Sequence, residues 1–152
     1  MAFPTGYLAD PEAAGAGETV GTLNMILTAT VFENALKIGR FAKLDTASID
    51  NIDASATPVL AGVVTRNVAL AIENGDTISS TLYSQIQYLR QGIVTIDVMA
   101  ADTPALFGAV FVRNTADDDA GKASTADDAN TEPSTAEFLY EVQANVWAIR
   151  LK

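Results

Sequence analysis

Short runs of branched and aromatic residues, separated by turn-forming residues, recur along most of the chain. Apolar residues alternate with a period of two along 144–151, and a second run at 59–66 begins directly after Pro58. Such alternation is typical of strands that bury one face. Similar runs lie at 23–32, 36–44, 67–72, 82–90, 93–99 and 105–112. About seven to nine strands of this kind predict an all-β fold: a small antiparallel β-sandwich or barrel, jelly-roll-like. Only 134–143 and 76–90 show weak helical patterns.

The clearest turn inside this pattern is Gln91-Gly92, which separates the run 82–90 from the run 93–99. Two strand-like runs joined by two residues that include glycine predict a β-hairpin. Asn74-Gly75-Asp76 predicts a further turn.

Residues 1–22 predict an extended N-terminal arm ahead of a single β domain that spans 23–152. Prolines and glycines interrupt any periodicity in this arm. Its large apolar side chains are Phe3, Tyr7 and Leu8. Two interpretations stay open: a frayed terminus, or a tail whose apolar side chains dock on a neighbouring molecule.

Residues 114–135 interrupt the strand pattern and predict an acidic, solvated and mobile loop inserted in the β domain. Its carboxylates are Asp117, Asp118, Asp119, Asp127, Asp128 and Glu132, opposed only by Lys122. The spacing does not fit an EF-hand. If Gly121 is the glycine at position six of the loop, ligand positions one and five fall on Ala116 and Ala120, which have no side-chain oxygen. A solvated run of charge is therefore favoured over a calcium site.

The composition excludes several classes of chemistry. The chain has no Cys and no His, which removes thiolate nucleophiles, imidazole bases and Cys or His zinc sites. The carboxylates crowd one loop, which disfavours a glycosidase pair facing across a cleft. We therefore expect no enzymatic activity, no cofactor and no metal. A net charge of −10 argues against nucleic-acid partners and against anionic membranes.

The few basic residues are unevenly placed. Lys37, Arg40 and Lys43 stand within one expected strand. Further arginines stand near the ends of expected strands: Arg66, Arg90, Arg113 and Arg150. These cations either protect strand edges or contact a partner surface. Alternation places Arg40 opposite Lys37 and Lys43, unless Gly39 marks a bulge. The predicted partner interface comprises Phe3, Tyr7, Leu8, Lys37, Arg40, Lys43 and Arg66.

The order of these features resembles that of the structural cement, or capsid decoration, proteins of tailed bacteriophages. The phrases that carry the resemblance are Phe3-Pro4-Thr5-Gly6-Tyr7, Pro58-Val59-Leu60-Ala61-Gly62-Val63-Val64-Thr65-Arg66 and Arg90-Gln91-Gly92-Ile93-Val94-Thr95-Ile96, followed by the acidic loop and a terminal strand. The resemblance covers roughly residues 30–151. It implies synthesis in the host cytoplasm and attachment to the outer face of an icosahedral head. The implied partners are the major capsid protein, which the chain would cement on the expanded shell, and other copies of the chain, as a dimer or trimer.

A ligand- or carbohydrate-binding β-sandwich module is the alternative from a different class. Tyr83, Tyr88 and Trp147 would then form a stacking platform, although aromatic residues in strands more often belong to a core.

Overall fold

A computed structural model describes residues 16–31, 36–45, 48–55, 57–65, 77–78 and 85–152 of the chain. All regular structure in these ranges is β, which confirms the predicted fold class, and none of them forms a helix long and apolar enough to cross a membrane. The strands are β1 (Thr19–Val31), β2 (Leu36–Lys37), β3 (Phe41–Asp45), β4 (Ser48–Asn51), β5 (Leu60–Val64), β6 (Thr77–Ile78), β7 (Gln85–Asp97), β8 (Ala109–Arg113), β9 (Ala123–Ser124), β10 (Thr131–Gln143) and β11 (Val146–Leu151).

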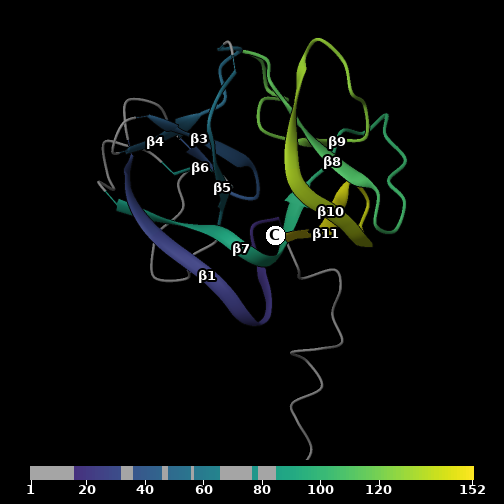
Figure 1. Ribbon diagram of the computed structural model, residues 1–152, viewed down its shortest axis with the longest axis horizontal. Helices are drawn as coiled ribbons and strands as arrows, with labels where there is room; N and C mark the ends of the chain where they lie inside the picture. Colours follow the sequence, from purple (N-terminus) through teal and green to yellow (C-terminus); the bar gives the residue numbers. More distant parts are fainter. Residues whose placement is uncertain (1–15, 32–35, 46–47, 56, 66–76, 79–84) are drawn as a thin grey trace, which may run out of the picture.

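One curled sheet contains nine of these strands, in the order β1-β4-β3-β5-β7-β11-β10-β8-β9. Because β7 also pairs with β1, the first five strands close into a ring, on the left of Figure 1. The β1–β4 pairing is parallel and the others are antiparallel. The remaining strands, β8 to β11, form a second lobe on the right, and β7 belongs to both. β2 and β6 pair separately.

The predicted hairpin at Gln91-Gly92 is wrong, because β7 runs without interruption through both residues. Gly92 has a φ of +125°, and a Cβ there would lie 2.1 Å from Oδ1 of Asn24. That Oδ1 accepts a hydrogen bond of 3.0 Å from the Ile93 N–H, at a shift in the β1–β7 register. The glycine is therefore required by the close approach of β1, and not by a turn.

The weak helical pattern at 134–143 is also wrong, because these residues lie in β10. Ala136, Glu137 and Phe138 are all buried, so the strand does not alternate cleanly between buried and exposed positions. The pattern at 76–90 lies partly outside the described residues, and its described parts are strands. Tertiary packing overrides the helical propensity of the alanine, glutamate and leucine in β10.

The expected boundary of the N-terminal arm at residue 22 lies too far along the chain. β1 begins at Thr19, and Ala16 and Gly17 are already buried. The Gly17 N–H donates a hydrogen bond of 2.6 Å to the Thr95 carbonyl of β7. Residues 16–22 therefore belong to the body of the molecule, whereas 1–15 lie outside the described residues.

The expected strand 36–44 divides at Gly39. Its φ of +73° places Gly39 in a turn between β2 and β3, so the side-chain alternation restarts at Phe41. Of the other expected runs, 59–66 and 144–151 match β5 and β11 closely, and the run at 105–112 starts as a strand only at Ala109. The run at 67–72 and the turn at Asn74-Gly75-Asp76 lie outside the described residues.

The apolar core of the described residues has two parts. One part lies within the ring of strands and includes Leu36, Ile49 and Ile86. The larger part joins the ring to the second lobe through Phe41, Val94 and other buried residues of β5, β7, β8, β10 and β11. This shared core holds the two lobes in a fixed relation, so the surface between them is a defined feature of the fold.

Candidate interaction surface

The acidic region contains strands and buried residues where the sequence predicts only a solvated loop. Within 114–135, Gly121, Ala123, Ser124 and Thr131 are buried, and the range includes β9 and the start of β10. We call residues 114–130, up to the start of β10, the acidic segment. Its Gly121 carbonyl accepts a hydrogen bond of 2.9 Å from the Phe41 N–H of β3. The acidic segment therefore packs directly on the ring.

Arg40 fixes the acidic segment to the ring. Its side chain is only 13% exposed, and Nε lies 3.3 Å from Oδ2 of Asp97. Nη1 donates to the backbone carbonyls of Asp118 and Ala120. A guanidinium suits this position because its planar fork binds a carboxylate and carbonyls together.

The neighbouring lysines also have partners within the chain. Lys37 Nζ lies 3.4 Å from the Asp118 carboxylate, and Lys43 Nζ lies 2.7 Å from that of Asp53. Hydrogen bonding to Lys43 lowers the pKa of Asp53 below its ordinary value. The assignment of Lys37, Arg40 and Lys43 to a partner interface stays a prediction. Phe3, Tyr7, Leu8 and Arg66, the other predicted interface residues, lie outside the described residues.

Carboxylates in the acidic segment are also bonded locally. Asp117 accepts hydrogen bonds from the Thr115 hydroxyl, at 2.6 Å, and from the Asp119 N–H, at 2.9 Å, and these lower the pKa of Asp117. Lys122 Nζ lies 2.7 Å from the Asp119 carboxylate. No group of three or more potential metal-ligating side chains occurs among the described residues.

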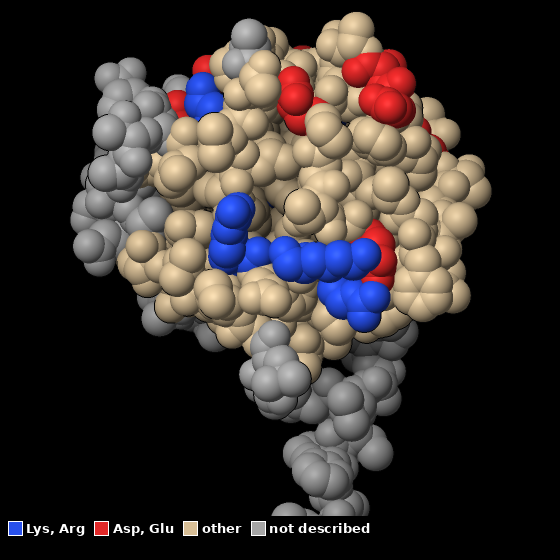
Figure 2. Space-filling model, viewed as in Figure 1, with Lys and Arg blue, Asp and Glu red and all other residues tan. Residues whose placement is uncertain are grey.

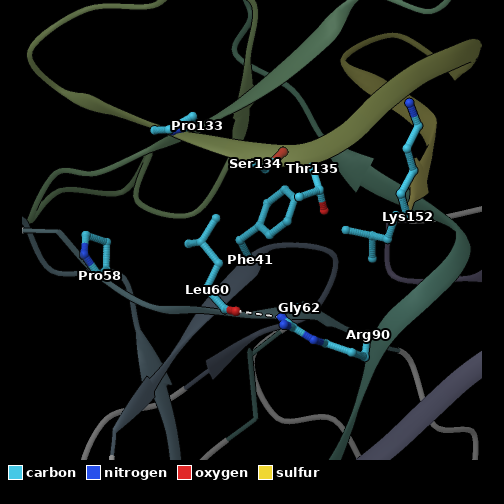
Figure 3. Close-up of a pocket in the computed structure, with 10 residues that line it drawn as sticks. Phe41, Pro58, Leu60, Gly62, Arg90, Pro133, Ser134, Thr135 and Lys152 are labelled. Atoms are coloured by element: carbon cyan, nitrogen blue, oxygen red, sulfur yellow. Dashed lines mark hydrogen bonds between the residues drawn. The ribbon is translucent and has the colours of Figure 1, made fainter.

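A cleft of about 470 Å³ lies between the ring and the second lobe. Figure 3 shows Phe41 and Leu60 on one side and Ser134 and Thr135 of β10 on the other. The residues that line this cleft are Phe41, Pro58, Leu60, Gly62, Arg90, Pro133, Ser134, Thr135, Leu151 and Lys152. A smaller hollow of about 160 Å³ shares Leu60 and Arg90 with it, so the two adjoin. We call them together the groove.

The smaller hollow forms an apolar end of the groove. Leu27, Leu44 and Val59 line it, and they are 39%, 43% and 63% exposed. The Leu44 N–H donates a hydrogen bond of 2.7 Å to the Val59 carbonyl, which holds these two side chains side by side. Large apolar side chains gathered at a hollow are typical of a binding surface.

Basic side chains lie where the two hollows meet and in the larger hollow. Arg90 lines both hollows, and its Nη1 donates a hydrogen bond of 2.8 Å to the Leu60 carbonyl (Figure 3). Nη1 also donates one of 3.0 Å to the Ala61 carbonyl, where a bulge interrupts the β3–β5 register. Lys152 Nζ lies 2.8 Å from the Glu137 carboxylate, which Arg150 also contacts. Hydrogen bonding to Lys152, reinforced by Arg150, lowers the pKa of Glu137. Figure 2 shows basic side chains in a band across this face, with acidic groups gathered mainly at its upper edge.

Two polar side chains of the groove have partners within the chain. Ser134 Oγ donates a hydrogen bond of 2.6 Å to the Val110 carbonyl, and Lys152 contacts Glu137.

The proposed aromatic platform is not assembled: Tyr88 is buried, and Trp147 packs edge-to-face on Phe138 with ring centroids 5.8 Å apart. Tyr83 lies outside the described residues.

The sequence pattern does not predict the groove, although it places Arg90 near a strand end. The apolar residues Leu27, Leu44 and Val59 come from distant parts of the chain, and Lys152 joins them only through the β7–β11 pairing. Alternation within a strand predicts two faces, but it does not identify which face the rest of the fold covers.

Comparisons with known proteins define the class as a phage capsid-associated protein. The model of the XM1 gp53 minor capsid protein family matches residues 6–152. A chain in the solved structure titled "The capsid of Myoviridae Phage XM1" is 31% identical, with a TM-score of 0.85, over 100% of this chain and 98% of that one. A comparison with curated proteins found no match.

The chain belongs to the XM1 gp53 minor capsid protein family. It is a virion structural protein that associates with the capsid, as the resemblance found in the sequence implied.

Proposed function

We propose that the protein binds the outer face of an icosahedral phage capsid and cements neighbouring major capsid protein subunits on the expanded head. Family membership over residues 6–152 is the observation that carries this proposal. The groove supports it, because it offers exposed apolar side chains beside cations on a surface held between two rigid lobes.

The distribution of charge supports an outward position for the acidic segment. Asp117 and Asp118 are exposed there, whereas the groove carries Arg90 and Lys152. Like charges repel across a poorly screened gap, so a molecule of net charge −10 would approach an acidic surface through its basic face. Attachment through the face that carries these cations leaves the acidic segment free to face solvent.

Cementing requires that binding of the protein stabilises the intact shell, which an experiment can test. A ligand that binds only the intact shell stabilises it by about 2.7 kcal/mol per site at a hundredfold excess over Kd. We therefore expect purified protein to cosediment with expanded shells to a fixed stoichiometry and to raise the temperature at which the shells disrupt. Unexpanded shells are the matched control, and we expect weak binding to them.

Two results would overturn the proposal. One is the absence of saturable binding to expanded shells. The other is saturable binding that leaves the disruption temperature of the shells unchanged, which would indicate decoration without cementing.

A further inference from the structure

We infer that the groove receives residues 3–12 of a second copy of this chain, so that neighbouring molecules on the shell are linked to one another. This inference rests on the proposed function, which places identical copies side by side.

The first argument is the match between the groove and that segment. Residues 3–12 read Phe-Pro-Thr-Gly-Tyr-Leu-Ala-Asp-Pro-Glu, with large apolar side chains first and two carboxylates last. The groove has a similar order of properties: Leu27, Leu44 and Val59 line the smaller hollow, Arg90 lies where the two hollows meet, and Lys152 lines the larger one. The match predicts a direction, with Phe3, Tyr7 and Leu8 on the apolar end and Asp10 and Glu12 near the cations.

The second argument concerns the groove itself. The side chains of Leu27, Leu44 and Val59 are exposed within the single chain, which favours an occupant from another copy. The two hollows share Leu60 and Arg90, so they adjoin on one face of the molecule. Arg90 is held against the Leu60 and Ala61 carbonyls, so its charge is already positioned before a ligand arrives.

The third argument concerns the cost of ordering the segment. Pro4 and Pro11 fix their own φ angles and bias the residues before them towards extended conformations. An extended segment that is already restricted loses less conformational entropy when it docks. Apolar grooves are a common means of recognising such extended segments.

The absence of cysteine from the chain makes a direct test possible, because any disulfide must join introduced residues. One copy carries Tyr7→Cys, and a second copy with a different affinity tag carries Val59→Cys. The two are mixed, bound to expanded shells and also kept free in solution, then oxidised. The control pair is Tyr7→Cys with Ala129→Cys, since Ala129 is exposed on the acidic segment.

We expect a disulfide between the differently tagged copies for the Val59 pair, and little for the Ala129 pair. Absence of this product, while both variants cosediment with shells, would overturn the inference and leave the proposed function standing. A disulfide formed only within one chain, in the double variant Tyr7→Cys with Val59→Cys, would overturn the assignment to a second copy. Failure of the unmodified protein to bind shells, read in the same gradients, would count against the proposed function alone.

A charge exchange tests the direction of docking. Lys152→Glu in the Val59→Cys copy, or Asp10→Lys with Glu12→Lys in the Tyr7→Cys copy, should lower the disulfide yield by about fivefold or more. Combining both sets should restore much of the yield. Equal yields in all four combinations would overturn the predicted direction.

Discussion

The acidic segment and the groove differ in how far their charged and apolar groups are satisfied within the chain. In the acidic segment, Asp117 and Asp119 are hydrogen-bonded locally, and Arg40 ties the backbone to the ring. In the groove, Leu44 and Val59 remain exposed. The more highly charged region is therefore the more self-contained one, and the groove is the surface with more to gain from a partner.

Removing the clamp between the acidic segment and the ring should have the largest effect on stability. Arg40→Ala leaves Asp97 without this cation and the carbonyls of Asp118 and Ala120 without their donor, so we expect a loss of about 2–3 kcal/mol. Urea denaturation measures it. Arg40→Lys is the control and should lose less, because it keeps the charge.

The same substitution separates two roles for Arg40. If Arg40 binds a partner and does little within the chain, Arg40→Ala will lower shell occupancy while the urea midpoint stays unchanged. That result would contradict the assignment of Arg40 as a clamp.

A glycine pair tests how tightly the acidic segment packs. Gly121 and Gly21 both have a φ of +79°, but a Cβ at Gly121 would lie 2.6 Å from the Phe41 carbonyl oxygen, whereas Gly21 has no atom within 4 Å. Gly21→Ala should cost about 1 kcal/mol for the backbone alone, and Gly121→Ala about 1–2 kcal/mol more. Thermal unfolding measures both. Equal losses would mean that the acidic segment yields readily.

Two substitutions that each add one negative charge compare the groove and the acidic segment as binding sites. Val59→Asp places a charge in the apolar end of the groove, and Ala129→Asp places one on the acidic segment. We expect Val59→Asp to weaken shell binding about tenfold, and Ala129→Asp to change it little. Quantitative cosedimentation measures both, and circular dichroism checks that both variants fold. A greater loss for Ala129→Asp would reverse the comparison.

Acid should affect the basic part of the groove through Glu137. Because its folded pKa lies below the ordinary value of 4.5, the charged form stabilises the fold above that pH, and this contribution is lost as the pH falls through the folded pKa. Glu137→Gln should therefore lower stability at pH 6, and its effect should shrink as the pH falls below 4.5 and through the folded pKa, where the native carboxylate itself becomes protonated.

The exposed Glu141 provides a charge-matched control. Glu141→Gln removes one carboxylate without breaking the contacts of Glu137 to Lys152 and Arg150, so it should cost less stability at pH 6 than Glu137→Gln. A Glu137→Gln variant with the same slope as the parent chain would show that the contacts to Lys152 and Arg150 contribute nothing measurable.

The sequence was sufficient to predict the fold class and several strands, because Leu60–Val64 lies in an apolar run directly after Pro58 and Val146–Leu151 carries a period-two pattern. It failed where distant contacts decide the structure. Gly92 reads as a turn residue, but Asn24 of β1 sets the requirement for glycine there. Glu137 reads as a helix-favouring residue, but Arg150 and Lys152 pair with it in a sheet.

The prediction of a loop for the acidic segment was incomplete for a related reason. A short buried strand, Ala123–Ser124, lies among its aspartates, and Gly121 packs on Phe41, a residue that lies far from it in sequence. The groove could not be predicted at all, since its residues meet only after the ring has closed. Local pattern predicts which elements form, and long-range pairing determines which surfaces remain open.

An electron-microscopy reconstruction of expanded shells decorated with the purified protein tests most directly whether the groove, and not the acidic segment, is the interaction surface. We predict that density from another polypeptide covers Leu27, Leu44 and Val59, and that the acidic segment faces solvent. An acidic segment pressed against the shell, with an empty groove facing outward, would contradict the assignment of the groove as the interaction surface.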